Sequence, residues 1–358
     1  MIRWRAGVVT ELGTGWRGVQ EAHVRVDNGT SMRALAYVDL VGSPEPGDRV
    51  LLNATALLMG LGTGGYAMVV ALPDRLPADP PPGPGHLVKA RYTPLQTTVL
   101  GVDEQASEHH ATLRDADDLA RMPVVVADLH SVLPAVLAGV RCERQGLRVA
   151  YVMADGGALP LAFSRAVAGL TAAGWLAGTV TAGQAYGGDL ESVTLHTGLL
   201  AARHVLDADV AVVTQGPGNL GTGTRWGYSG VAAGEALNAT AALGGRPVAA
   251  LRVSEGDQRE RHRGVSHHSL TAYGRVALAP ADVVLPALGG DFWDGVGAQA
   301  RTLAGRHRVV EVPADGLRTA LEASPVPLST MGRGLDEDEA AFIAAAAAGR
   351  YAAGLVGY

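Results

Sequence analysis

The chain has very little of several residue types on which common kinds of site depend. Its 358 residues include one cysteine, Cys142, and one lysine, Lys89. A single cysteine excludes an internal disulfide and a thiolate zinc site, and it suits a reducing, cytoplasmic compartment. No GxxxxGK pattern surrounds Lys89, which excludes a P-loop, and a Schiff-base enzyme would have to use this one residue.

Basic charge is also scarce. The formal net charge is −6, and no basic cluster accompanies an amphipathic stretch, which argues against nucleic acid and a membrane surface as partners. Two long uncharged stretches, 54–72 and 166–188, are diluted by Gly, Thr and Ala, so we expect no transmembrane helix. No signal-peptide pattern opens the sequence. The expected partner is a small molecule, and association into homo-oligomers stays open.

The first 72 residues carry the pattern of a small β-barrel. Apolar and polar residues alternate over 3–9 and 22–26, and further strand patterns cover 34–41, 49–55 and 66–72. Asn28-Gly29 between two of these strands predicts a two-residue type I′ hairpin turn. Five or six short strands with tight turns indicate a closed barrel. Residues 73–85 contain six prolines in thirteen positions, which predicts a stiff linker.

From residue 86 to 358 the pattern changes to that of an α/β ligand-binding or catalytic domain. After two short strands at 86–93 and 97–103, continuous apolar strands are expected at 123–127, 148–154, 176–180, 209–214, 247–253, 283–288 and 308–312. Strands that are apolar on both faces are typical of a parallel sheet covered by helices. We therefore predict an α/β protein with a small N-terminal β-barrel followed by a predominantly parallel, Rossmann-like three-layer sheet domain. Its ligand should bind at the carboxyl ends of the strands.

Acidic and histidine side chains follow two of the predicted strands. Asp128 and His130 come after the first, and Asp155 comes after the second. Their functional interpretation is acid–base catalysis or, together with His267, a divalent metal site. The structural alternative is that Asp128 caps a helix and His130 binds backbone.

Two glycine-rich loops are candidates for anion binding. Gly187, Gly188 and Asp189 precede a predicted helix, which Asp189 would equally suit as N-cap. A longer loop offers free backbone N–H groups, and its candidate residues are Gln215, Gly216, Gly218, Asn219, Gly221, Gly223 and Thr224. It formally contains GxGxxG. The helix begins about eight residues after Gly221 and no acid ends the next strand, so we do not expect a dinucleotide site.

The segment after the 247–253 strand concentrates arginine and histidine. Arg259, Arg261, His262 and Arg263 offer contacts to a phosphate or carboxylate, and Ser266 is a natural N-cap. His267 and His268 would then lie at a positively polarised helix start. That position lowers the pKa of an imidazole and suits a base or a metal ligand. A solvated charged loop is the alternative.

Four motifs together resemble a known family. They are RERHRGVSHHSLTAYGRVAL, QGPGNLGTGTRWGYSG, AYGGDLES and VADLHS, and the chain is similar through them to a bacterial domain-of-unknown-function family, DUF3866. The similarity covers nearly the whole chain. The resemblance implies that the barrel and the α/β domain occur together in this order as one unit. It implies no activity.

The hypothesis that best fits these patterns is a hydrolase or group transferase that acts on a small anionic substrate. Asp128, His130, Asp155, His267 and His268 would be catalytic, and the glycine-rich loops and arginines would hold the anion. A non-catalytic nucleotide or metabolite sensor, or an assembly module, is the alternative. A divalent metal stays open, with Asp128, His130, Asp155 and His267 as its candidate ligands.

Overall fold

A computed structural model describes residues 1–357, and the chain divides into two compact units. The first unit comprises Met1–Pro84, Val88–Thr98 and Ala162–Ala168, and the rest of the described chain forms the second. No helix in the described part of the chain is long and apolar enough to cross a membrane.

The first unit contains a closed five-stranded barrel with the strand order β1-β2-β3-β5-β4. Its strands are β1 (Trp4–Trp16), β2 (Val19–Val26), β3 (Ser31–Tyr37), β4 (Arg49–Asn53) and β5 (Ala67–Ala71), and the helical turns α1 (Val38–Val41) and α2 (Thr55–Leu58) lie between them. Alternate side chains such as Val24, Leu52 and Val69 fill the interior, as the two-residue period of a strand requires. The predicted barrel is confirmed.

The β2–β3 hairpin forms where predicted, but its turn is of a different type. A type I′ turn needs a positive φ at both central residues. Gly29 has φ +86°, whereas Asn28 is not among the residues with positive φ. The Gly29 N–H donates to Val26 O (2.8 Å), and the Val26 N–H donates to Thr30 O (2.8 Å). These bonds describe a three-residue loop with its glycine in the left-handed position, which is the next most common hairpin connection.

The second unit is built on an eight-stranded sheet with the order β11-β10-β9-β12-β8-β13-β16-β17. All of its pairings are parallel. The strands are β8 (Pro123–Val126), β9 (Val149–Ala154), β10 (Gly178–Thr181), β11 (Leu190–Glu191), β12 (Val210–Gln215), β13 (Arg246–Ala250), β16 (Asp282–Ala287) and β17 (Arg308–Pro313). The α/β Rossmann-like prediction is confirmed, although β11 was not expected as a strand. The central strands β8, β9 and β12 are buried on both faces, which accounts for their continuous apolar sequences.

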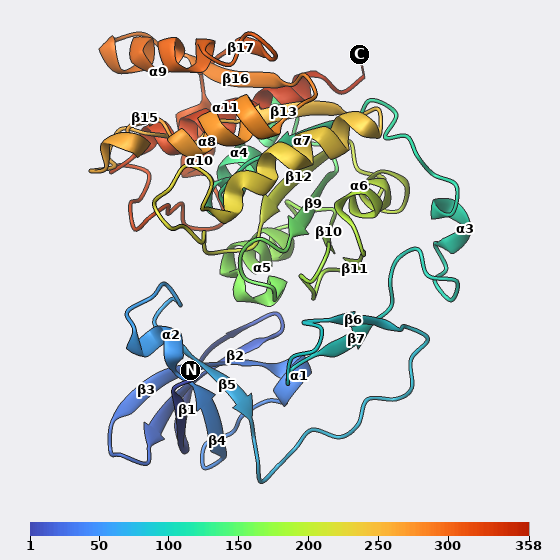
Figure 1. The fold of residues 1–358 in the computed structure, drawn as a ribbon, viewed down its shortest axis with the longest axis vertical. Coiled ribbons are helices and arrows are strands. Elements are labelled where there is room, and N and C mark those ends of the chain that lie inside the picture. Colours follow the sequence, from blue (N-terminus) through green and yellow to red (C-terminus); the bar gives the residue numbers. More distant parts are fainter. Residues whose placement is uncertain (358) are drawn as a thin grey trace. The chain divides into compact units, whose positions relative to one another are not determined.

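Helices cover both faces of this sheet (Figure 1). The helices α6 (Leu195–His204) and α7 (Ala232–Ala242) lie on one face, and α4 (Leu133–Glu143) and α11 (Glu339–Gly354) pair on the other. Alanine and glycine let the second pair approach closely. A Cβ atom on Gly139 of α4 would lie 1.9 Å from the backbone oxygen of Ala346 in α11. The absence of a side chain at Gly139 therefore allows the backbones of α4 and α11 to pack directly against each other.

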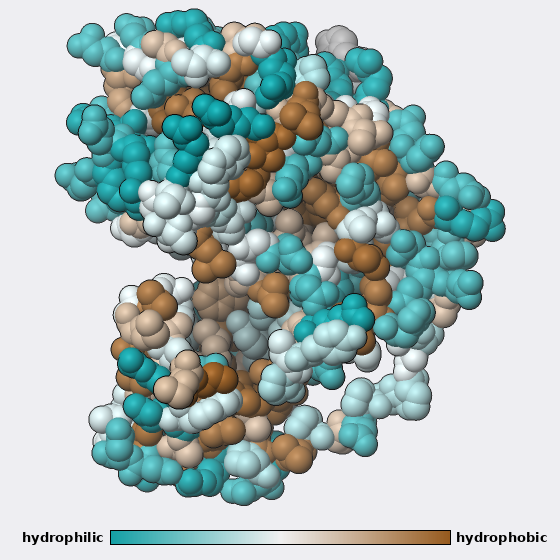
Figure 2. Space-filling model, viewed as in Figure 1, coloured by the Kyte–Doolittle hydropathy of each residue, from teal (hydrophilic) through white to brown (hydrophobic). Residues whose placement is uncertain are grey.

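The remaining elements are short or lie near the edges. They are β6 (Leu87–Lys89) and β7 (Thr97–Val99), which pair with each other; α3 (His110–Leu113); α5 (Arg165–Ala172); α9 (Asp291–Arg301); and α10 (Leu317–Glu322). After β13, the strands β14 (Val253–Ser254) and β15 (Gly264–Val265) form an antiparallel hairpin, and α8 (His267–Thr271) continues into a π-helical turn, Ala272–Val276. On the face shown in Figure 2, hydrophilic side chains gather over the region of β15 and α9.

Candidate functional site

Three neighbouring strands, β12, β8 and β13, end at one cavity of about 360 Å³. It is lined by segments that follow these strands, with Met331 added from a distant loop. The structure brings the following sequence-predicted residues to its wall: His130, Gln215, Gly216, Gly218, Asn219, Gly221, Gly223, Arg259, Arg261, His262, His267 and His268. None of the lining residues is acidic, so the cavity presents imidazole, guanidinium and backbone groups.

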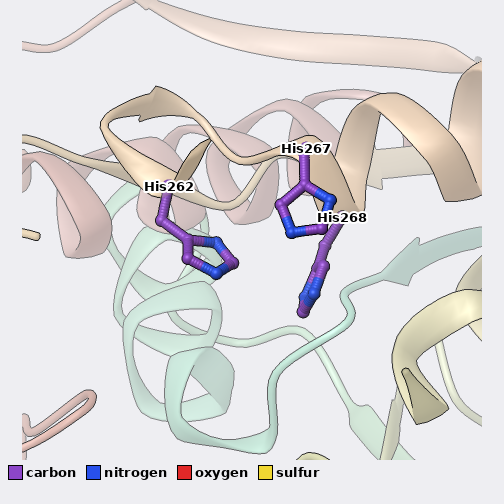
Figure 3. Close-up of side chains that lie close together, drawn as sticks. All are labelled: His262, His267 and His268. Atoms are coloured by element: carbon purple, nitrogen blue, oxygen red, sulfur yellow. The ribbon is translucent and has the colours of Figure 1, made fainter. Parts of the chain in front are cut away.

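Three histidines cluster on the β13 side of the cavity (Figure 3). The centroids of the His262, His267 and His268 rings are 4.4–4.9 Å apart. His262 lies at the end of the loop that connects β14 and β15, and only the short strand β15 separates it from the start of α8. Ser266 then caps α8, as predicted, and its Oγ accepts a hydrogen bond from the His268 N–H.

Burial keeps two of these imidazoles neutral at pH 7. Desolvation first, and then nearby positive charge such as Arg252, lowers the pKa of His262 to about 3. Desolvation and the neighbouring His268 lower the pKa of His267 to about 4. The direction matches the expectation from sequence, but the main cause is burial rather than a helix start, since α8 has five residues. Neutral imidazoles can accept a proton or bind a metal.

His268 is held by three side chains. Its ring stacks on Tyr228 with centroids 3.7 Å apart and an interplanar angle of 4°. Its Nδ1 atom lies 3.2 Å from Arg252 Nη1 and 3.6 Å from Asp128 Oδ2. Asp128 is 2% exposed, and its Oδ2 is 3.9 Å from Arg252 Nη1. Asp128 therefore acts on the cavity indirectly, through His268 and Arg252.

His130 lines the same cavity through a different set of contacts. Its Nδ1 lies 2.8 Å from the Tyr151 hydroxyl, which lies 2.8 Å from Thr214 Oγ1. Burial lowers the pKa of His130 to about 4 and raises the pKa of Tyr151. Asp128 and His130 thus follow the same strand but engage different partners.

The glycine-rich loop after β12 offers unused donors. The backbone N–H groups of Gly218, Asn219, Gly221 and Gly223 donate no hydrogen bond within the described residues. Free backbone N–H groups of this kind can bind an anion. Gly216 has another reason to be glycine, because a Cβ there would lie 2.1 Å from the backbone oxygen of Ala158. Thr224 accepts from Gly227 N within the loop rather than lining the cavity.

The predicted arginines divide into three cases. Arg259 lines the cavity but forms a bidentate pair with the buried Asp257, with N···O distances of 2.9 and 2.7 Å. Arg261 lines the cavity and forms no ion pair with a carboxylate in the described part of the chain. Arg263 does not line the cavity. Arg261 is thus the guanidinium most available to a ligand.

Four of the predicted residues lie elsewhere. Asp155 lines a second cavity of about 280 Å³ together with Asp128 and His196, and its Oδ2 accepts from Gln184 N (2.8 Å). Gly187, Gly188 and Asp189 lead into β11, not into a helix, and Thr194 is the N-cap of α6. The proposed N-cap role of Asp189 is therefore wrong, because its carboxylate instead accepts from Thr179 N and Oγ1, both at 2.8 Å.

Several buried polar atoms around the first cavity accept or donate no hydrogen bond within the described residues. They are Asp128 Oδ2, Gln215 Oε1, Asn219 Nδ2 and His267 Nε2. A buried polar atom without a hydrogen bond is costly and calls for an explanation. These atoms belong to residues at or beside the same cavity, so a ligand or ion bound there would explain them together.

Sequence reasoning missed Arg252 and Tyr228. Arg252 is 8% exposed and was expected inside the 247–253 strand, but the strand ends at Ala250. A lone charged residue at the end of an apolar run was the available signal. Tyr228 carried no such signal, because its role depends on stacking with His268, forty positions away.

Comparison with known proteins identifies a family and no characterised relative. No curated protein and no solved structure is significantly similar to the chain. The family model described as protein of unknown function, DUF3866, matches residues 33–349, which is most of the chain, and the resemblance seen in the motifs is confirmed. This chain is a member of the DUF3866 family.

Proposed function

We propose that the protein is an enzyme, a hydrolase or group transferase, that acts on a small substrate carrying a phosphate or carboxylate group. The observation that carries this proposal is the composition of the first cavity. Four histidines, three arginines and a loop with unused N–H groups line it, and no acidic residue does.

The binding part of the proposal depends on the loop and the guanidinium groups. Gly218, Asn219, Gly221 and Gly223 would donate backbone hydrogen bonds to the anion, and Arg261 would add a charge-assisted contact. An acidic residue in the wall would repel such a ligand, and the lining contains none.

The chemical part depends on the imidazoles. His267 and His130 have pKa values of about 4, so each would enter the reaction as a neutral base or as a ligand. Asp128 would orient His268 through the 3.6 Å contact to its Nδ1. A positioned general base contributes typically 10²–10⁴-fold to a rate.

The test is a panel of phosphomonoesters, phosphodiesters and carboxylate esters, assayed with the wild-type protein and with His130→Ala and His267→Ala. We expect turnover of at least one class and a loss of about 100-fold or more in each variant. His23→Ala, at a barrel histidine whose side chain is 41% exposed, is the matched control and should leave the rate unchanged.

Binding measured in parallel separates this proposal from the sensor alternative. Calorimetric titration with inorganic phosphate and with citrate reports affinity without turnover. Anion affinity that survives in both histidine variants, with no turnover of any substrate by the wild-type protein, would favour a non-catalytic sensor and overturn the enzyme proposal.

A further inference from the structure

We infer that His262, His267 and His268 form a divalent-metal centre of the zinc type, with a coordination position open to the first cavity. Among residues 1–357, these histidines are the one group of three or more His, Cys, Asp or Glu residues whose candidate ligand atoms lie within 4.8 Å of one another. The metal candidates expected from sequence, Asp128, His130, Asp155 and His267, do not form such a group.

The spacing of the rings suits a tetrahedral ion. Zinc binds imidazole nitrogen at about 2.0–2.1 Å, which places the nitrogens of a tetrahedral site about 3.4 Å apart. The observed atoms lie within 4.8 Å, so small ring rotations would close the site. Figure 3 shows the three rings grouped around one space. Three protein ligands with the next position open is the arrangement of catalytic zinc sites.

His267 provides an independent observation. Its Nε2 atom is buried and forms no hydrogen bond with any described residue. An imidazole nitrogen that lies among two other imidazoles and has no partner is explained by a metal ion, which would take its lone pair.

The surroundings also match those of metal-binding histidines, which usually give their second ring nitrogen to a hydrogen-bond partner. His262 Nδ1 lies 2.8 Å from Ser266 Oγ, and a metal would take the Nε2 lone pair in place of its 3.5 Å contact with Arg261 Nε. Beside His268, the buried Asp128 Oδ2 has no hydrogen bond and lies 3.6 Å from Nδ1. In this structure Nδ1 accepts from Arg252 Nη1 (3.2 Å). A metal on the other nitrogen of His268 would place the proton on Nδ1 and exchange this contact for a hydrogen bond to Asp128.

The charge around the cluster permits a cation. Two of the three cavity arginines face carboxylates, Arg259 with Asp257 and Arg252 with Asp128, the second pair at 3.9 Å. Arg261 has no such partner, and its charge acts on His267. Its side chain is exposed, so metal binding would require this guanidinium to move away from the cluster. Three imidazoles favour zinc, cobalt or nickel over magnesium and calcium, which prefer oxygen ligands.

The experiment uses the full chain, purified without a histidine tag and dialysed against a chelator. Calorimetric titration with ZnCl₂ and absorption titration with CoCl₂ report affinity, stoichiometry and geometry. We expect one equivalent per chain and the visible absorption bands of tetrahedral cobalt. His262→Ala and His267→Ala should each weaken binding at least about 100-fold, since loss of a second-shell partner alone costs 10–100-fold. His23→Ala should bind like the wild type.

His262→Gln and His267→Gln keep the test decisive if the alanine variants do not fold, because glutamine preserves volume and hydrogen bonding. Circular dichroism of the metal-free variants checks the fold. Absence of stoichiometric binding of zinc, cobalt and nickel to the wild-type protein would overturn the inference. So would unweakened binding by the folded glutamine variants.

The inference deepens the proposed function by placing a metal at the same cavity, and the two can fail separately. Turnover by a protein that binds none of the three metals stoichiometrically would overturn the metal centre and leave the enzyme proposal standing. Stoichiometric metal binding in a protein that turns over no substrate would do the reverse.

Discussion

Two polar segments of the second unit follow strands of the same sheet and end up with opposite properties. The segment after β10, residues 182–192, turns its carboxylates back onto the sheet: Asp189 accepts from Thr179, and Glu191 accepts from Thr181 Oγ1 (2.7 Å) and Gly187 N (2.6 Å). The segment after β13, residues 251–268, leaves His267 Nε2 without a hydrogen bond and faces a cavity.

The difference separates a structural polar loop from a candidate ligand site. Both segments had the same sequence signal, which was polar residues at the end of a buried strand. In the first, the chain supplies the hydrogen-bond partners, and the polar groups stabilise the edge of the sheet. In the second, partners are missing at buried atoms, which supports the proposed ligand site.

The largest expected effect is a loss of protein stability in acid, and it comes from His130 at the candidate site. Burial lowers the pKa of His130 to about 4 from its usual 6.5. The unfolded chain therefore binds a proton at a higher pH than the native protein does. The free energy of unfolding should fall as the pH drops through 6.5 and level off near 4, by about 3 kcal/mol from this residue.

Urea unfolding at a series of pH values, for the wild type and His130→Gln, checks this expectation. The variant should lose this part of the pH dependence, because it has no imidazole to titrate. An equal pH dependence in the two proteins would contradict it.

The second-largest effect is expected in the structural segment after β10. Asp189→Ala removes the acceptor of the Thr179 N–H and hydroxyl, and Thr179 is completely buried. We expect a loss of about 2 kcal/mol in the free energy of unfolding, within the usual cost of an unsatisfied buried group. Phosphate affinity, measured by calorimetry, should not change.

Asp189→Asn, which keeps one acceptor oxygen, is the matched variant and should lose less stability. A large loss of anion affinity in either Asp189 variant, with the fold intact, would remove the distinction between the two segments.

The smallest effect should come from the cavity arginine without a carboxylate partner. Arg261→Gln removes one charge-assisted contact at an exposed position, for which we expect about 10-fold weaker phosphate binding. The salt dependence of binding should also decrease. Arg263→Gln, at an exposed arginine outside the cavity lining, is the control, and an equal loss in both variants would show that Arg261 has no special role.

Much of the fold could be predicted because its signals are local. Alternation over residues 22–26 predicted a barrel strand, and the apolar run at 209–214 predicted a central parallel strand. The hairpin at Asn28-Gly29 was predicted in place but not in type, since the choice between a two-residue and a three-residue loop depends on how the flanking strands pair. The two-residue strand β11 is too short to leave a pattern.

The candidate site was predictable in part. Ser266 as the N-cap, and the polar segments at the ends of β8, β12 and β13, followed from sequence. The grouping of His262 with His267 and His268 did not, because it depends on the conformation of the loop between β14 and β15, which carries His262.

The sequence by itself determined which segments are strands, which face is apolar, and which chemical groups stand at the strand ends, because these properties depend on neighbours a few positions apart. The tertiary structure decided which groups meet. It placed His268 beside Asp128, 140 positions away, and it placed the Asp189 carboxylate where it accepts a hydrogen bond from Thr179. The physical reason is that a polar group's role depends on whether another part of the chain satisfies it. Whether a polar group finds such a partner depends on how distant segments pack.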